Sequence, residues 1–320
     1  MVDQTLDVKP IAGRTGGPLK AWSLISVVFL LGLIILGGVV RITDSGLGCP
    51  DWPFCHGRVI PSTDPATMIE YFHRLVAAVT GLIIVGTGVI IWRSHRDDRR
   101  LTRPVVLTIL LLIVQVILGW ITVRTELNEW LVMAHLTVAQ SVLALMILIA
   151  VTGRSEQGHT SSEAHSPISS TARWTFISAL AATFIVILSG AYTQATGATG
   201  ACGDSWPLCS GSLFPDTFLE GVHMGHRLIT IVAVPIIAAA AHQAYNLRNR
   251  APGLSRLAPL FVALFVGQIV VGGINVMLGF HRATNVLHLA AATFVWAALV
   301  LLVAVVYLGP RAEGGERNAA

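Results

Sequence analysis

The sequence predicts an all-α integral membrane protein, in which eight transmembrane helices form two repeated four-helix bundles related by a pseudo-two-fold axis along the membrane normal. The first observation is compositional: of the 320 residues, 54% are hydrophobic and only 12% are charged, and the mean hydropathy is +0.71. The second is that the apolar residues gather in eight runs, each close to the length of about 20 residues that a helix needs to cross a bilayer. The third is that the two halves of the chain match at one fixed offset.

The composition also excludes several classes of protein. An ordinary soluble domain has about 25% charged residues, roughly twice the fraction found here. The net charge of +4 is small for this length, although the isoelectric point is near 9.1. A soluble globular enzyme, a disordered chain and a nucleic-acid-binding protein are therefore excluded, and a lipid bilayer is the expected surrounding.

The eight apolar runs define the expected spans in chain order. They are Ala21–Val40, Tyr71–Trp92, Val105–Val123, Trp130–Val151, Trp174–Tyr192, Val222–Tyr245, Leu257–Met277 and Val286–Tyr307. The first run is too long for the core of a signal peptide and no small-residue cleavage site follows it, so we expect a retained span. Trp and Tyr stand at many of the ends, as in the aromatic belts of membrane interfaces. Helices are expected because backbone groups in lipid must pair within each segment, and the alternating pattern of barrel strands is missing. Pro235 inside the sixth run predicts a modest kink.

The segment Gly153–Thr171 divides the chain into halves. It is rich in Ser, Thr, Glu and His and lacks an apolar period, which is typical of a flexible linker. Its two histidines, His159 and His165, are expected to be solvated. The predicted parts are an N-terminal tail (1–20), a first four-helix half (21–152), a linker (153–173), a second four-helix half (174–307) and a C-terminal tail (308–320).

Basic residues indicate the orientation of the spans. Fifteen of the 21 Lys and Arg residues, including the cluster Arg93–Arg103, fall on the side that holds both termini. The other six are Arg41, Arg58, Arg74, Arg124, Arg227 and Arg282. The positive-inside rule therefore places both termini, the tails and the linker in the cytoplasm, and the cysteine-containing loops outside. We interpret the arginine cluster as this topology signal, and not as a nucleic-acid-binding patch.

The two halves repeat with an offset of 153 residues. The matches are His73-Arg74 with His226-Arg227, Gln115 with Gln268, Gly119 with Gly272, and His135 with His288. The loop from Gly48 to Cys55 also resembles the loop from Ala201 to Cys209, with one inserted residue. Each half has an even number of spans, so the repeats are parallel and the expected axis lies along the membrane normal.

Four histidines, His73, His135, His226 and His288, occupy repeat-related places, each within about one turn of the outer end of its predicted span. Ionisable side chains inside a span are costly and tend to mark function. Two neutral imidazoles on facing helices of a bundle can bind a haem iron from both sides. Zinc fits less well because no third or fourth ligand recurs in both halves, and a proton relay would not need this pairing. We therefore expect two haem sites, one in each half.

The halves differ three residues before the first histidine, where Glu70 corresponds to His223. A carboxylate near a porphyrin edge can take a proton or stabilise developing positive charge, which predicts a reaction site in the first half only. A helix N-terminal acid favoured by the dipole is the structural alternative. Arg74 and Arg227 would either pair with haem propionates or extend to lipid phosphate.

All four cysteines lie in the two outward loops: Cys49, Cys55, Cys202 and Cys209. The outer compartment permits disulfides, and three pairings are possible, of which bridges within each loop are the most economical. CxxC spacing is missing. We interpret the cysteines as staples that fix each loop over its haem, with redox catalysis as the alternative.

Together these residues resemble the bacterial haem A synthase family over nearly all of Ala21–Tyr307. The Glu70-Tyr71-Phe72-His73-Arg74 motif, the second His226-Arg227 pair and the paired-cysteine loops carry the resemblance. It implies oxidation of a methyl group of haem O to a formyl group, giving haem A for terminal oxidases, with haem b as cofactor. The implied partners are haem O synthase and an aa3-type terminal oxidase.

The resemblance also implies a role for each site residue. His73 and His135 would be axial ligands of the substrate haem, His226 and His288 would bind haem b, and Glu70 would be the catalytic carboxylate. The implied disulfides are Cys49–Cys55 and Cys202–Cys209.

Three other functions share part of this pattern. A non-enzymatic dihaem membrane cytochrome b that carries electrons would have similar histidines but no reason for Glu70 in one half only. A transporter would need broken helices and midplane polar groups, which are scarce here. A quinone-linked thiol oxidase is disfavoured because CxxC spacing is missing.

Overall fold

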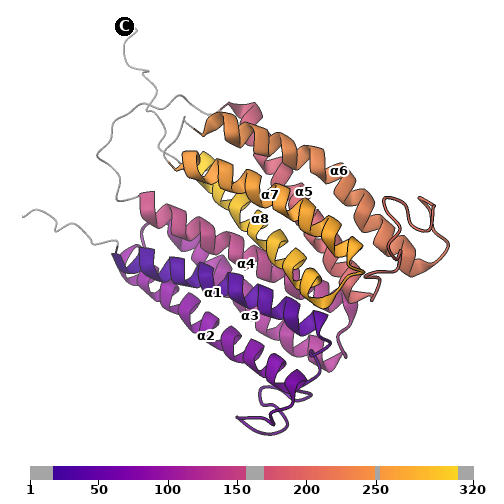
Figure 1. Ribbon diagram of the computed structural model, residues 1–320. Helices are drawn as coiled ribbons and strands as arrows, with labels where there is room; N and C mark the ends of the chain where they lie inside the picture. The colour runs from indigo at the N-terminus through magenta and orange to yellow at the C-terminus, as the bar shows by residue number, and fades with distance from the viewer. Residues whose placement is uncertain (1–16, 156–168, 249–252, 309–320) are drawn as a thin grey trace, which may run out of the picture.

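Eight α-helices form the part of the chain that the computed structural model describes, which is residues 17–155, 169–248 and 253–308 (Figure 1). In chain order they are α1 (Gly17–Ile42), α2 (Pro65–Ser94), α3 (Arg99–Arg124), α4 (Glu129–Ser155), α5 (Ser170–Ala195), α6 (Phe218–Leu247), α7 (Leu254–Met277) and α8 (Arg282–Leu308). All eight are long and apolar enough to cross a membrane, which confirms the predicted fold class. Most of both predicted tails and residues 156–168 of the predicted linker, with His159 and His165, lie outside the described residues.

All eight helices begin before their predicted apolar runs, and α2 and α6 show why. The side chain of Asp64 accepts a hydrogen bond from Thr67 N at 3.1 Å, and Pro65 opens α2. Thr217 Oγ1 accepts from Glu220 N at 3.3 Å at the start of α6. These caps satisfy backbone N–H groups that have no partner in the first turn. The additional polar turns carry no hydropathy signal, so the helices extend beyond the predicted apolar runs at these ends.

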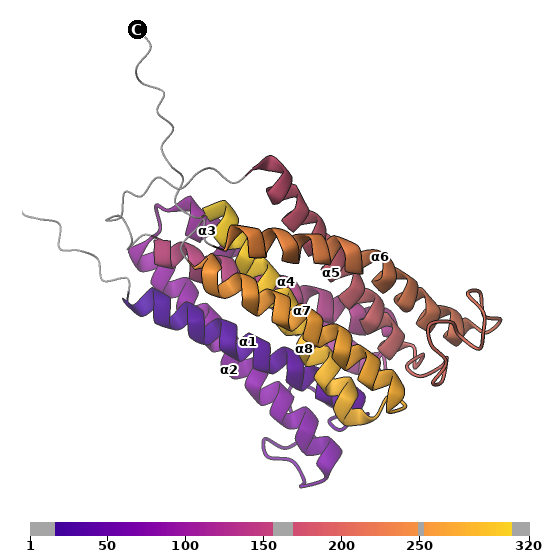
Figure 2. The ribbon, with the colours of Figure 1, turned by 45° about the horizontal axis from the view of Figure 1, so that its top comes forward.

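The helices pack as two closed four-helix bundles that lie side by side (Figures 1 and 2). In the first bundle α1 contacts α2 and α4, and α3 contacts both α2 and α4. The second bundle repeats this arrangement, with α5 against α6 and α8, and α7 against α6 and α8. Both cysteine loops lie at the same end of the molecule, at the lower right of Figure 1.

The contacts between the bundles are consistent with a pseudo-two-fold axis. α1 packs on α8 and α4 packs on α5, which are equivalent contacts in the repeat, and α4 packs on α8 at the centre. Gln140 and Thr293, separated by the repeat offset of 153, meet there with Gln140 Nε2 donating to Thr293 Oγ1 at 3.5 Å. An axis places equivalent residues opposite each other in this way. The indole N–H of Trp296 donates to the Gln140 carbonyl at 3.2 Å in the same interface.

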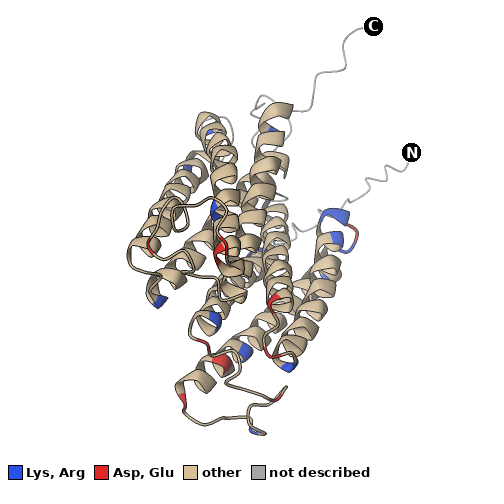
Figure 3. Cartoon of the chain, turned by 90° about the vertical axis from the view of Figure 1, so that its right-hand side faces the viewer, with Lys and Arg blue, Asp and Glu red and all other residues tan. Residues whose placement is uncertain are grey.

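The outer surfaces of the bundles suit a hydrocarbon surrounding. Figure 3 shows that most of the helical surface carries neither basic nor acidic residues. Exposed apolar side chains include Leu82, Leu110 and Val232, while Leu143 and Leu299 are fully buried. Lipid tails are as apolar as leucine, so close packing supplies most of the association between helices in a membrane. Small residues at helix contacts are therefore important for the fold.

Gly38 tests this packing between the bundles. A Cβ at Gly38 would stand 2.7 Å from Leu289 Cδ1 of α8, so we expect Gly38→Leu to lower the free energy of unfolding by about 1–3 kcal/mol through overpacking. Thermal unfolding in detergent micelles measures this effect. Gly32→Leu is the control, because Gly32 is exposed and no atom lies within 4 Å of a Cβ there. Adding Leu289→Ala should restore part of the loss, and an equal effect of the two glycine variants would contradict the expectation.

Candidate functional site

Each of the four repeat-related histidines packs against a glycine on the neighbouring helix. His73 of α2 lies on Gly37 of α1, where a Cβ would stand 3.1 Å from the ring Cε1 atom. The other three contacts, with distances of 3.2, 3.4 and 3.1 Å, are Gly190–His226, Gly119–His135 and Gly272–His288. Glycine lets the ring lie directly against the helix backbone, because any side chain there would push the imidazole away.

The match between Gly37 and Gly190 was not among the predicted repeat matches, although the two glycines are separated by the repeat offset of 153. A search for further identities at that offset would have found them. Only the structure shows that they serve the same purpose as Gly119 and Gly272, since both pairs line the histidine rings.

The histidines take matching depths in the two halves. His73 and His226 are the ninth residues of α2 and α6, and His135 and His288 are the seventh residues of α4 and α8. At 1.5 Å per residue the rings lie roughly 9 to 12 Å from the starts of their helices. The sequence places them within about one turn of the span ends. His73 and His226 stand further from the starts of their helices than from the predicted span ends, because α2 and α6 begin before their apolar runs.

The structure brings the histidines together in two pairs, one in each bundle. His73 and His135 lie within electrostatic reach of each other, and so do His226 and His288. All four are half-buried. Nδ1 of His73 and Nδ1 of His135 are both buried without a hydrogen-bond partner. The first bundle therefore holds two imidazoles that each have one buried nitrogen without a hydrogen bond in the described part of the chain.

Two glutamines stand beside the histidines of α4 and α8. Gln115 Nε2 lies 3.0 Å from His135 Nε2. Gln268 Nε2 lies 3.3 Å from His288 Nδ1 and 3.5 Å from its Nε2. The amide oxygens of both glutamines are buried without partners. The repeat-related match of Gln115 and Gln268 in the sequence thus corresponds to one shared structural position.

These pairs suit a ligand that brings most of its own donors to the iron. In the described residues, no cluster of three or more His, Cys, Asp and Glu side chains is placed to hold a metal ion. A porphyrin supplies four nitrogens and needs only one axial ligand on each face. Paired imidazoles, each set against a glycine, fit that requirement, and in the first pair both Nδ1 atoms are buried without partners.

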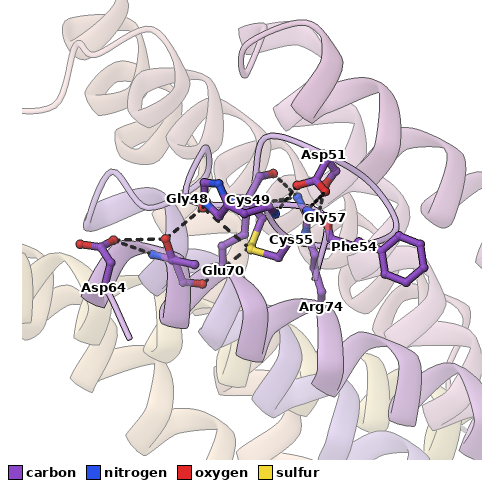
Figure 4. Close-up of a disulfide and its surroundings, with 11 residues drawn as sticks. Gly48, Cys49, Asp51, Phe54, Cys55, Gly57, Asp64, Glu70 and Arg74 are labelled. Atoms are coloured by element: carbon purple, nitrogen blue, oxygen red, sulfur yellow. Dashed lines mark hydrogen bonds and ion pairs between the residues drawn. A yellow bond between two sulfur atoms is a disulfide. The ribbon is translucent and has the colours of Figure 1, made fainter. Parts of the chain in front are cut away.

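Glu70 is held in a network with Arg74 and the first cysteine loop (Figure 4). One oxygen of the Glu70 carboxylate accepts from the Cys49 backbone N–H at 2.8 Å, and the other accepts from Arg74 at 2.5 Å. Arg74 also donates to the carbonyls of Cys49, Asp51 and Phe54 at 2.6, 2.6 and 2.9 Å. The Glu70 residue is only 3% exposed. Its carboxylate is therefore fixed in direction and shielded from water.

A disulfide closes each cysteine loop, joining Cys49 to Cys55 and Cys202 to Cys209. These are the pairings within each loop. In the first loop, the Asp51 carboxylate accepts from the Gly57 N–H at 2.6 Å and from the His56 N–H at 2.5 Å. These hydrogen bonds, the one from Gly57 first, hold the pKa of Asp51 below its usual value.

The two loops turn in the same way. His56 and Gly57 have positive φ in the first loop, as do Ser210 and Gly211 in the second. Two positive φ angles are typical of the tight turn that joins antiparallel segments. Backbone hydrogen bonds pair Cys55 with Arg58 at 3.1 Å in the first loop, and the second loop repeats this pairing between Cys209 and Ser212. The two loops thus share the same turn and the same backbone pairing.

The second half lacks the acid that Arg74 contacts. Arg227 donates to the carbonyls of Ser205 and Leu208 at 2.6 and 3.1 Å, but its second terminal nitrogen is buried and has no partner. His223 occupies the place of Glu70, with its Nδ1 3.5 Å from the Cys202 N–H. The replacement of a carboxylate by an imidazole therefore leaves an open donor on Arg227.

Comparisons with known proteins agree over almost the whole chain. A family model described as cytochrome oxidase assembly protein, COX15-CtaA, matches residues 20–300. A heme A synthase from Exiguobacterium sp. is 34% identical over 256 residues, which are 75% of this chain and 79% of the relative. Those of Symbiobacterium thermophilum and Shouchella clausii are each 29% identical, over 89% and 92% of this chain and 94% and 97% of the relatives. The match runs from α1 into α8 and includes both bundles.

Arg74 and Arg227 match in the repeat, but only Arg74 pairs with a buried acid, so replacing it should cost more stability. Arg74→Gln leaves a buried carboxylate without its cation, for which we expect a loss of roughly 3–5 kcal/mol in the free energy of unfolding. Arg227→Gln removes hydrogen bonds to carbonyls but strands no acid, so it should cost less. Thermal unfolding in detergent compares the two variants. Adding Glu70→Gln to Arg74→Gln should recover part of the loss, and equal losses for the two arginine variants would contradict the assignment.

Proposed function

The chain belongs to the COX15-CtaA family of cytochrome oxidase assembly proteins, and we propose that it is a haem A synthase, an enzyme that oxidises the methyl group of haem O to a formyl group. The product, haem A, serves terminal oxidases. The observation that carries the proposal is the duplicated pair of imidazoles, each packed on a glycine, with a buried carboxylate beside one pair only.

In this proposal the first bundle holds the substrate and the second holds the cofactor. Haem O enters from the membrane and lies between His73 and His135. His226 and His288 would hold haem b, which would supply electron transfer. The assignment is supported by Glu70, because a reaction site needs an acid or base that an electron-transfer site does not.

Glu70 acts on the reacting methyl group through its fixed carboxylate. Its two oxygens are held by the Cys49 N–H and by Arg74, so the carboxylate needs no reorganisation when positive charge develops on the substrate. We propose that it stabilises this charge and takes a proton from the attacking water. Oxidation of the methyl group would proceed in successive two-electron steps, with water supplying the formyl oxygen and haem b passing the released electrons to an external acceptor.

The two arginines differ in what they can offer a haem. The terminal nitrogens of Arg74 are engaged by Glu70 and loop carbonyls, whereas Arg227 has a buried nitrogen without a partner. Arg227 is therefore the better candidate for a haem propionate, with which guanidinium groups form strong charge-assisted hydrogen bonds. Arg74 contributes chiefly by holding Glu70 and the loop.

The orientation that we propose puts both termini in the cytoplasm and the cysteine loops outside, as the distribution of basic residues indicates. The disulfides are compatible with that compartment. The disulfide Cys49–Cys55 fixes the backbone N–H that binds Glu70, and Cys202–Cys209 closes the equivalent loop. A haem O synthase and an aa3-type oxidase are the proposed partners in supply and delivery.

Replacing Glu70 tests its role in the reaction. We expect Glu70→Gln to reduce haem A formation by about 100-fold or more, the usual range for loss of an acid–base group, while haem b content is unchanged. Haems extracted from cells that also make haem O are identified by chromatography. The control is Glu129→Gln, since Glu129 stands in the first turn of α4 in the same bundle. A normal yield of haem A from Glu70→Gln would remove this residue from the mechanism.

Alanine at each histidine tests the assignment of the two bundles. His226→Ala and His288→Ala should lose most of the haem b from the purified protein, because each removes one of two axial ligands. His73→Ala and His135→Ala should keep haem b but fail to bind haem O. Pyridine haemochrome spectra measure both haems. If all four variants keep the haem content of the unmodified protein, neither pair binds iron.

A further inference from the structure

One hydrogen bond separates two otherwise equivalent histidines. His226 and His73 match in the repeat, and each rests on a glycine, Gly190 or Gly37. The residue before that glycine is Ser189 in α5 and Leu36 in α1. Ser189 Oγ lies 2.8 Å from His226 Nδ1, whereas His73 Nδ1 is buried without a partner.

The contacts of Ser189 determine which group is the donor in its hydrogen bond with His226. Its Oγ also lies 2.9 Å from the Val186 carbonyl oxygen, which can only accept. A hydroxyl has one hydrogen, so Ser189 donates that hydrogen to Val186 and accepts from the Nδ1–H of His226. The imidazole of His226 is thereby held in the tautomer that leaves Nε2 free to bind a metal.

The first bundle has no equivalent device. Leu36 offers no acceptor, so nothing fixes the tautomer of His73. Its partner His135 is also less available, because the Gln115 amide stands 3.0 Å from His135 Nε2 and must give up that contact before iron can bind there. In the second bundle the corresponding contacts of Gln268 with His288 are longer, at 3.3 and 3.5 Å.

We infer that Ser189 is a positioning residue that makes His226 a firmer iron ligand than His73. The haem of the second bundle then stays bound through many turnovers while the haem of the first bundle is exchanged. Hydrogen bonds from the outer nitrogen of a ligating histidine fix the ring and increase its electron donation to the metal. The inference rests on the proposed haem sites and adds to them a reason why one haem is a cofactor and the other a substrate.

The experiment compares Ser189→Ala with Ser189→Thr in the full-length protein purified in detergent. Haem loss is followed by transfer to an excess of apomyoglobin, and the midpoint potential of haem b is measured by redox titration. Ser189→Ala should lose haem b about tenfold faster or more, in the range typical of changes next to a metal ligand, and its potential should rise because electron donation falls. Ser189→Thr keeps a hydroxyl, so its rate of haem loss and its midpoint potential should match those of the unmodified protein.

Ser141→Ala is the matched control. Ser141 makes the same kind of bond to its own helix, at 2.8 Å to the Thr137 carbonyl, and the structure gives it no histidine partner. If Ser189→Ala acted only by weakening helix packing, Ser141→Ala would also lose haem faster, and Ser189→Thr would not restore haem retention. An unchanged potential and rate in Ser189→Ala would overturn the inference.

Leu36→Ser tests the inference in the opposite direction and does not depend on the stability of the α5 variants. A hydroxyl at this position should slow the loss of haem from the first bundle by several-fold, and an unaltered rate would overturn the proposed asymmetry. If the unmodified protein binds no haem through His226 and His288, the proposed function itself fails. Bound haem with no response to Ser189 defeats the inference alone.

Discussion

Direct contact between an imidazole ring and the backbone of a neighbouring helix determines the geometry of this protein. At Gly37, Gly119, Gly190 and Gly272 the missing side chain leaves space that a histidine ring fills, with Cε1 3.1–3.4 Å from where a Cβ would be. The distance between the helices is set by these contacts. Each bundle thereby presents two imidazoles to a common interior, and the loops, arginines and glutamines are arranged around them.

Duplication explains why the bundles agree, and the proposed chemistry depends on the places where they differ. The loops share a disulfide, a tight turn with two positive φ angles and an arginine that donates to their carbonyls. Glu70 and His223 break this equivalence on one side of each loop, and Leu36 and Ser189 break it behind one histidine. The first bundle gains a fixed carboxylate, and the second gains a fixed imidazole. Under the proposed function these serve opposite requirements, since a reaction site would have to exchange its substrate and an electron-transfer site would have to keep its cofactor.

The network around Glu70 shows how a buried acid is maintained near the membrane surface. A carboxylate with 3% exposure needs both a cation and a hydrogen-bond donor to offset its loss of water. Arg74 supplies the first from the same helix, and the Cys49 N–H supplies the second from the loop. The disulfide limits the movement of that loop, so the carboxylate is tied to a part of the chain that is itself cross-linked.

Hydropathy and repetition were enough to predict the eight helices and their division into two bundles, because crossing a bilayer demands long apolar runs. Repetition also singled out four histidines, which the structure places in one pair in each bundle. The starts of α2 and α6 could not be read this way, since Asp64 and Thr217 cap polar turns that have no hydropathy signal. Nor could the loop carbonyls that bind Arg74 or the contact of Ser189 with His226, since these join residues 20 or more positions apart. Such contacts arise only when helices that are distant in sequence pack together, and a single-residue difference such as Leu36 and Ser189 acquires meaning only from the ring beside it.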